Sequence, residues 1–208
     1  MSIDVRKTAW VILNTLDQDR RTLNTLMDDY SGAGQVDSRR DRALLQTLVY
    51  GVLRWKGRLD YIISHFSSTR FDKINPKILN ILRLALFQII YLDRIPDSAA
   101  VNTAVDMAKA SGAPWVVRYV NALLRKASRD YRNVSFPDMG ENAITALATA
   151  KSFPEWIILR WLHRYGQKKT AHLCDAGNSI PPITVRTNTL KISPGELLTE
   201  LDREAEHA

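Results

Sequence analysis

Four arginines and one asparagine recur at spacings of three and four residues near the middle of this 208-residue chain. They are Arg118, Asn121, Arg125, Arg129 and Arg132. Because each residue of an α-helix advances by about 100°, these spacings place all five on one narrow stripe. The planar fork of an arginine donates two parallel hydrogen bonds and suits a phosphate group. The stripe therefore predicts a surface for a polyanion. The alternative is a solvated face whose arginines pair with carboxylates of neighbouring helices.

Aromatic and basic residues extend this candidate surface. Trp115 and Tyr119 flank the stripe and could stack on unpaired bases, as recognition of single-stranded RNA often requires. Arg6 and Lys7, in the first expected helix, could add to the same basic surface. The alternative for these two residues is a frayed, exposed helix end. We predict RNA contacts at the five stripe residues and at Arg6 and Lys7.

Groups that could perform catalysis or bind a metal are few. Cys174 is the single cysteine, which excludes an intrachain disulfide and a Cys-rich metal site, and we expect its side chain to be buried. The four histidines show no metal-ligand spacing such as H-x-x-x-H. Phosphate-loop and nucleophile-elbow motifs are also absent from the sequence. We therefore predict no catalytic, cofactor-binding or metal-binding residue in this chain.

The charge of the chain is unevenly distributed. Residues 1–133 hold 21 Lys and Arg against 13 Asp and Glu, a net charge of +8, and residues 134–208 hold 8 against 9. This asymmetry suggests two units, the first with a polyanionic partner. The most apolar segment, residues 78–92, is shorter than the roughly 20 residues of a membrane span. Without a signal peptide at the N-terminus, we expect a cytoplasmic protein with no membrane partner.

Helical periodicity dominates the first 133 residues. Apolar residues at core spacing predict some seven helical segments and no strand, which is an all-α bundle with short connections. Asn75 is a good N-cap before Pro76, and Pro114 opens the helix that carries the stripe. Gly51, inside a helical pattern, indicates close packing between helices.

The character of the sequence changes after residue 133. Residues 134–150 are typical of a linker and a short helix, and residues 151–208 of the start of a small α+β domain. Within the latter, the segment 181–192, "PPITVRTNTLKI", alternates like a strand, and Ser193 with Glu196 predicts a capped helix. Because a lone strand is not stable, we expect the chain to stop inside this domain, with the partner strands missing.

Residues 95–126, "IPDSAAVNTAVDMAKASGAPWVVRYVNALLRK", resemble the hallmark segment of NusB-like domains. Val101–Asn102 and Val120–Asn121 fill the two V-N positions of that family, and Tyr119 stands where the family often has Phe. Residues 48–63 are similar to the matching earlier helix. The resemblance implies a NusB-like, RNA-binding helical bundle over residues 1–133.

Two relatives within this resemblance compete. One is the transcription antitermination factor NusB, an adaptor without catalysis that binds RNA and a ribosomal protein. The other is the N-terminal region of the Fmu/Sun (RsmB) family, which methylates carbon 5 of a cytosine in small-subunit ribosomal RNA. Arg125, where antitermination factors typically have Asp, favours the second. So do the later segments "SFPEWIILRWLHRYG" and "SIPPITVRTNTLK", which look like the elements ahead of the methyltransferase domain.

The second resemblance implies a complete enzyme that uses S-adenosylmethionine (AdoMet) and has ribosomal RNA as its partner. Cytosine methylation of this kind needs a thiolate nucleophile, but Cys174 lies well ahead of the expected catalytic domain, which is absent from these residues. We therefore expect the fragment to be inactive alone and to position the missing domain on rRNA. An antitermination adaptor with a protein partner and a helical protein-interaction module without an RNA role are the alternatives.

Overall fold

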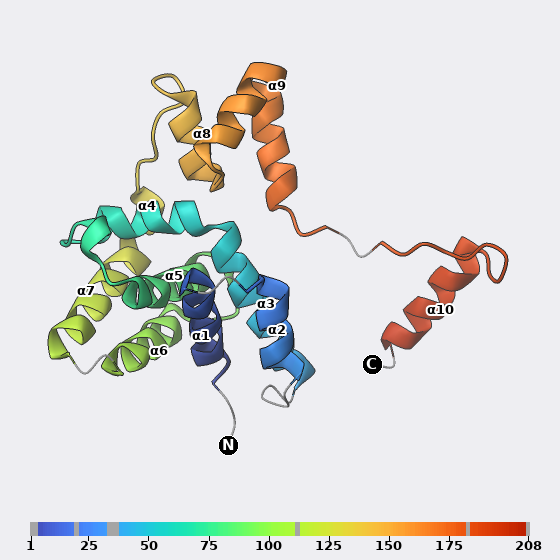
Figure 1. Ribbon diagram of the computed structural model, residues 1–208, viewed down its shortest axis with the longest axis horizontal. Coiled ribbons are helices and arrows are strands. Elements are labelled where there is room, and N and C mark those ends of the chain that lie inside the picture. Colours follow the sequence, from blue (N-terminus) through green and yellow to red (C-terminus); the bar gives the residue numbers. More distant parts are fainter. Residues whose placement is uncertain (1–3, 19–20, 33–37, 111–112, 182–183, 207–208) are drawn as a thin grey trace. The chain divides into compact units, whose positions relative to one another are not determined.

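The computed structural model describes residues 4–18, 21–32, 38–110, 113–181 and 184–206. The chain forms two compact units, Met1–Asn178 and Ser179–Ala208. The described residues form the following helices, shown in Figure 1: α1 Val5–Gln18, α2 Leu23–Gly32, α3 Arg39–Arg54, α4 Lys56–Phe66, α5 Pro76–Tyr91, α6 Asp97–Lys109, α7 Pro114–Asp130, α8 Ala143–Lys151, α9 Glu155–Asn178 and α10 Pro194–Glu206, with short 3₁₀ turns η1 Phe71–Lys73 and η2 Tyr131–Asn133.

Helix α5 is the centre of the first unit. Every side chain from Ile78 to Ile89 is buried, and α1, α3, α4, α6 and α7 all contact this helix. In Figure 1 it lies between α4 and α6. The Asn75 Oδ1 atom accepts a hydrogen bond from the Lys77 backbone N–H at 2.9 Å, and Pro76 follows at the first helical position, which confirms the predicted cap.

A charged network crosses this core. The Nε and Nη2 atoms of buried Arg83 donate to the two carboxylate oxygens of Asp60 on α4 at 2.6 and 2.8 Å. Its Nη1 atom donates to Asn80, whose amide in turn donates to Asn14 and Asp17 on α1. A buried charge is tolerated only when it is paired and hydrogen-bonded. The network therefore joins α1 and α4 to α5 by charged and polar contacts.

The prediction of an all-α bundle for residues 1–133 is confirmed. Seven α-helices, α1 to α7, occupy this range, and its described residues contain no strand. Gly51 on α3 is buried, and a Cβ atom placed on it would overlap the ring of Phe87 on α5, which confirms the predicted close packing. Within the described parts of the chain, no helix has the length and apolar character needed to cross a bilayer.

Helices α8 and α9 pack against each other, and α8 also contacts α4. Their small core includes Leu147, Ile158 and Cys174. Ser152 ends α8 in the left-handed conformation, with φ of 60°, and its Oγ accepts a hydrogen bond from the Gly57 N–H at 2.8 Å. The segment that follows the bundle is thus attached to α4 by a specific polar contact.

The predicted strand and the predicted capped helix both fall in the second unit, Ser179–Ala208. A strand over residues 181–192 was expected, but the described part of this segment forms no strand and ends in a turn around residues 189–191. The physical reason is that a ladder needs a partner strand, and none occurs among the described residues. The predicted cap of α10 is confirmed, because the Glu196 N–H donates to Ser193 Oγ and the Ser193 N–H donates to Glu196 Oε2. The Ser193 hydroxyl, which donates to Glu196 Oε2 at 2.7 Å, and the Ser193 backbone N–H lower the pKa of Glu196.

Candidate nucleic-acid interface

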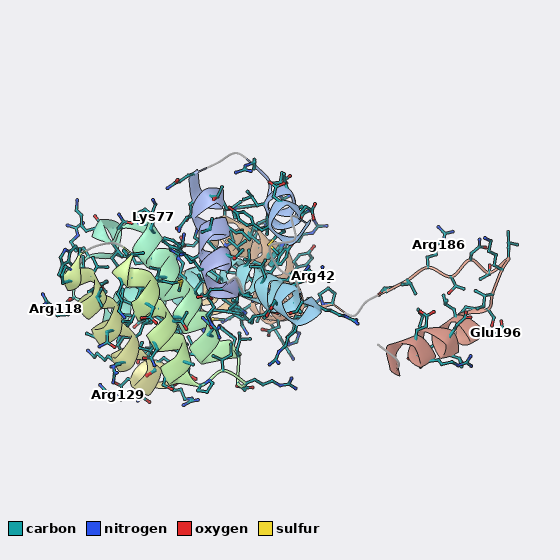
Figure 2. All side chains as sticks on the ribbon, turned by 90° about the horizontal axis from the view of Figure 1, so that it is seen from below. Arg42, Lys77, Arg118, Arg129, Arg186 and Glu196 are labelled. Carbon is teal, nitrogen blue, oxygen red and sulfur yellow. The ribbon has the colours of Figure 1, made fainter. Side chains whose placement is uncertain are left out.

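Helix α7 has two sharply different faces. Val116, Val120, Leu123, Leu124 and Ala127 are buried against the bundle. The other face carries the predicted stripe. Arg118, Arg125 and Arg129 are exposed on α7, Arg132 is exposed in η2, and Asn121 is half-buried. Figure 2 labels Arg118 and Arg129 near opposite ends of α7, so the basic face extends along the length of the helix.

The arginines of this stripe have no carboxylate partner within the described ranges of the chain. None of Arg118, Arg125, Arg129 and Arg132 forms an ion pair there, although several other surface arginines and lysines do. Like charges at a spacing of four residues on a helix repel one another. The arrangement therefore leaves a row of positive charge whose counter-charge is not supplied by a described residue.

Local contacts orient two members of the stripe. The Arg125 Nε atom donates to Asn121 Oδ1 at 2.9 Å, which holds the guanidinium group one turn along the helix surface. The Arg132 guanidinium lies over the ring of Tyr131, 4.9 Å from its centroid. Asn121 thus orients an arginine in this structure, and both guanidinium groups keep further N–H donors for a ligand.

Arg6 has a partner within the bundle. This side chain is half-buried, and its Nε atom donates to Gln88 Oε1 on α5 at 2.6 Å. Gln88 is itself buried and donates to the Leu84 backbone oxygen. Arg6 therefore ties α1 to α5. Lys7 is exposed and borders a shallow hollow between α1 and α6, next to Asp4 and Asp106.

A hollow on the side of α7 near its N-terminal end was not foreseen. It has a volume of about 470 Å³ and is lined by residues of α1, η1, α5, α6 and α7. The lining includes the flanking aromatics Trp115 and Tyr119, together with Trp10, Lys73 and Lys77, which the sequence analysis did not single out. Spacing along one helix could reveal only the first two, because the other three come from elements distant in sequence.

Exposed cations also occur on α9, outside the α7 stripe. Arg160, Arg164, Lys168 and Lys169 are exposed on α9. The acidic residues of α10 cancel these charges when residues 134–208 are counted together. Local counting along α9 would have found them.

The single thiol is not exposed for chemistry. Cys174 is fully buried, which confirms the expected packing role. Burial raises the pKa of this thiol, the Asp175 carboxylate acts in the same direction, and Lys151 opposes them. A raised pKa disfavours the reactive thiolate. Across the described ranges, no three His, Cys, Asp or Glu side chains cluster in a way that could hold a metal ion.

Two family models match the chain. The NusB family model matches residues 4–129, and the model described as "Methyltr_RsmF/B-like, ferredoxin-like domain" matches residues 153–208. The chain belongs to the NusB family. Its second matched segment has the character of the ferredoxin-like domain of RsmF/B-like methyltransferases.

Known proteins agree with this assignment. The chain is 34% identical over 200 residues to the "Probable ribosomal RNA small subunit methyltransferase B" of Bacillus subtilis, and the match covers 96% of this chain and 44% of that protein. The chain thus spans less than half the length of that relative. It is 33% identical to the "Transcription antitermination protein NusB" of Bacillus velezensis, over 46% of this chain and 74% of that protein.

A solved structure, described as the crystal structure of PH0851, shares the fold. Its TM-score is 0.64 at 20% identity, and the match covers 99% of this chain and 46% of that one. The resemblance to the N-terminal region of the small-subunit rRNA methyltransferase B family is confirmed. The similarity to the antitermination protein is weaker, because it covers less than half of the chain.

Proposed function

We propose that this chain is the RNA-binding N-terminal region of an AdoMet-dependent small-subunit rRNA (cytosine-5-)-methyltransferase that acts in the cytoplasm. Residues 1–133 are the RNA-binding domain, residues 134–150 a linker and short helix, and residues 151–208 the beginning of the pre-catalytic domain. The helical domain places the catalytic domain, which these residues do not include, on rRNA. The matches to the two family models and to a methyltransferase relative support this proposal.

The observation that carries the RNA-binding role is the unpaired row of arginines on α7. Arg118, Arg125 and Arg129 are the principal phosphate contacts, and Arg132 extends the row. Exposed guanidinium groups that no carboxylate of the described residues pairs with favour a polyanionic ligand, since phosphate accepts two parallel hydrogen bonds from each. Asn121 orients Arg125. Lys7 is a peripheral contact, and Arg6 can contribute only with the donors that Gln88 leaves free.

The described residues of this chain do not fit an AdoMet site. The sequence has no Gly-rich nucleotide loop, and the described residues form no parallel sheet to present one. AdoMet would supply the methyl group in the complete enzyme. The described residues contribute RNA binding and the attachment of α8 to the bundle through Gly57 and Ser152.

Charge reversal tests this proposal. We expect Arg125→Glu/Arg129→Glu to weaken binding of a small-subunit rRNA fragment in a gel-shift assay at two salt concentrations, most strongly at the lower one. Arg160→Glu/Arg164→Glu on α9 is the matched control, because its two exposed arginines have the same spacing and undergo the same change of charge. Equal affinity of the α7 variant and the unmodified chain would overturn the RNA-binding role.

The second candidate is an antitermination adaptor, which the match to the Bacillus velezensis protein favours. The reading frame beyond residue 208 separates the two candidates. Continuation into a Gly-rich AdoMet loop and catalytic cysteines supports the methyltransferase, and a stop codon supports the adaptor.

A further inference from the structure

The pocket beside the N-terminal end of α7 is built from apolar and aromatic groups. Ile78 of α5 and Val116 of α7 are buried in its lining, and Trp10, Trp115 and Tyr119 add three aromatic rings. Its volume of about 470 Å³ lies within the range of roughly 300–1,000 Å³ typical of small-molecule sites. The pocket is therefore large enough to take a planar ring system among aromatic side chains.

Two of the three rings are held in place. The Trp10 Nε1–H donates to the Lys77 backbone oxygen at 2.8 Å. Tyr119 Oη lies 2.8 Å from Ser67 Oγ, and the Ser67 hydroxyl donates to the Thr69 backbone oxygen, so Tyr119 donates to Ser67. Preformed rings bind a ligand with little loss of conformational entropy.

Trp115 differs from the other two rings. Its side chain is 63% exposed on the first turn of α7. Unlike Trp156, which is as exposed, Trp115 lines a pocket together with two other aromatic rings. The ring is therefore available to cover a flat group that enters the pocket.

The lining also carries positive charge. Lys73 and Lys77 are exposed, and Arg118 borders an adjoining hollow on α7. None of the three forms an ion pair with another described residue, whereas Asp72 and Asp106 of the surrounding elements are paired with Arg70 and Lys109. Figure 2 labels Lys77 and Arg118, whose helices α5 and α7 both line the pocket. An apolar pocket with unpaired cations suits a ligand that joins a flat ring to a negative charge.

We propose that this pocket takes one unstacked base of single-stranded RNA, whose ribose-phosphate chain continues onto the α7 arginines. The inference rests on the proposed RNA-binding function and adds to it a site that selects single strands. Base stacking on aromatic side chains tolerates any base, because every base has a π-face. In a duplex the bases are stacked and paired, so their faces cannot enter the pocket.

The test compares two tryptophans of nearly equal exposure. Trp115 is 63% exposed at the pocket and Trp156 is 64% exposed on α9, so Trp115→Ala and Trp156→Ala remove similar surface from the full 208-residue chain. The probes are oligouridylate and oligoadenylate of about 12 nucleotides, an RNA duplex of the same length and inorganic polyphosphate. Circular dichroism melting verifies that both variants are folded.

We expect Trp115→Ala to weaken binding of both single strands by roughly 5- to 150-fold, the range found for loss of one base–aromatic stack. Binding of the duplex and of polyphosphate should not change, and Trp156→Ala should leave every affinity unchanged. The salt dependence of Trp115→Ala should equal that of the unmodified chain, because no phosphate contact is removed.

Three results would overturn the proposal that this pocket binds an RNA base. Trp115→Ala could bind single strands as well as the unmodified chain does, which would leave the pocket to a protein or other partner. Trp115→Ala could weaken the binding of all four probes equally. Trp156→Ala could weaken the binding of single strands as much as Trp115→Ala does. If Arg125→Glu/Arg129→Glu still weakens RNA binding in these cases, the base-binding role of the pocket is rejected and the proposed function stands. Failure of the unmodified chain to bind any RNA would reject both.

Discussion

Two arginine-bearing regions of the same bundle are built in opposite ways. Between α4 and α5, Arg83 is 5% exposed and donates to both carboxylate oxygens of Asp60. On the outer face of α7, Arg125 and Arg129 are exposed, and no carboxylate of the described residues pairs with them. An arginine that serves packing has its counter-charge within the chain. The described residues supply no such counter-charge to the arginines of α7.

The largest effect should come from removing the counter-charge in the interior. We expect Asp60→Ala to lower the free energy of unfolding by roughly 3 kcal/mol, because Arg83 would remain buried with its charge unpaired. Urea denaturation measures this change. Arg125→Ala should stay within about 0.5 kcal/mol of the unmodified chain, since its side chain is exposed. Similar losses in the two variants would remove the distinction between the regions.

A smaller effect should come from the closest helix contact of the interior. We expect Gly51→Ala to destabilise the first unit by about 1–3 kcal/mol, because the new methyl group would overlap the Phe87 ring. Alanine's better helix propensity, about 1 kcal/mol, opposes part of this loss. Gly195→Ala on α10 is the control, because the space around that position is open. A Gly51→Ala protein with unchanged thermal unfolding would show that α3 and α5 pack less closely than described.

The smallest effect should be the part of the pH dependence of the unfolding free energy that comes from Tyr91. Burial raises the pKa of Tyr91 to about 12, and the nearby Arg58 opposes this shift. A folded pKa above the unfolded value of about 10 means that the stability due to the neutral phenol is complete below pH 10 and is lost as pH rises towards 12. Unfolding free energies measured from pH 9 upward should fall less steeply in Tyr91→Phe. An equal fall of the unfolding free energy with pH in the two proteins would contradict the burial of the Tyr91 phenol.

Local sequence signals predicted much of the bundle. The continuous apolar run of α5, its cap at Asn75 and Pro76, and the Pro114 start of α7 are properties of neighbouring residues, and all three are found in the structure. The two faces of α7 follow from helical periodicity alone. The strand expected over 181–192 failed because a strand depends on partners elsewhere in the chain, which no local pattern can supply.

The candidate site was predicted less completely, for the same reason. The α7 stripe lies on one helix, so its spacing defines it. Arg6 is bonded to Gln88, 82 residues away, and Lys77 lines one pocket with Trp10 and Trp115 only through the packing of separate elements. Contacts of this kind depend on the tertiary structure, which explains why the sequence predicted neither the Gln88 partner of Arg6 nor the pocket.

The central claim, that the α7 arginines contact phosphates, is tested most directly by the salt dependence of RNA binding. Each lost phosphate contact should reduce the slope of log affinity against log salt by about 0.7–0.9. We predict that Arg125→Glu/Arg129→Glu flattens this slope by about 1.5 or more, whereas Arg160→Glu/Arg164→Glu leaves it unchanged. An identical slope for the α7 variant and the unmodified chain would contradict the account.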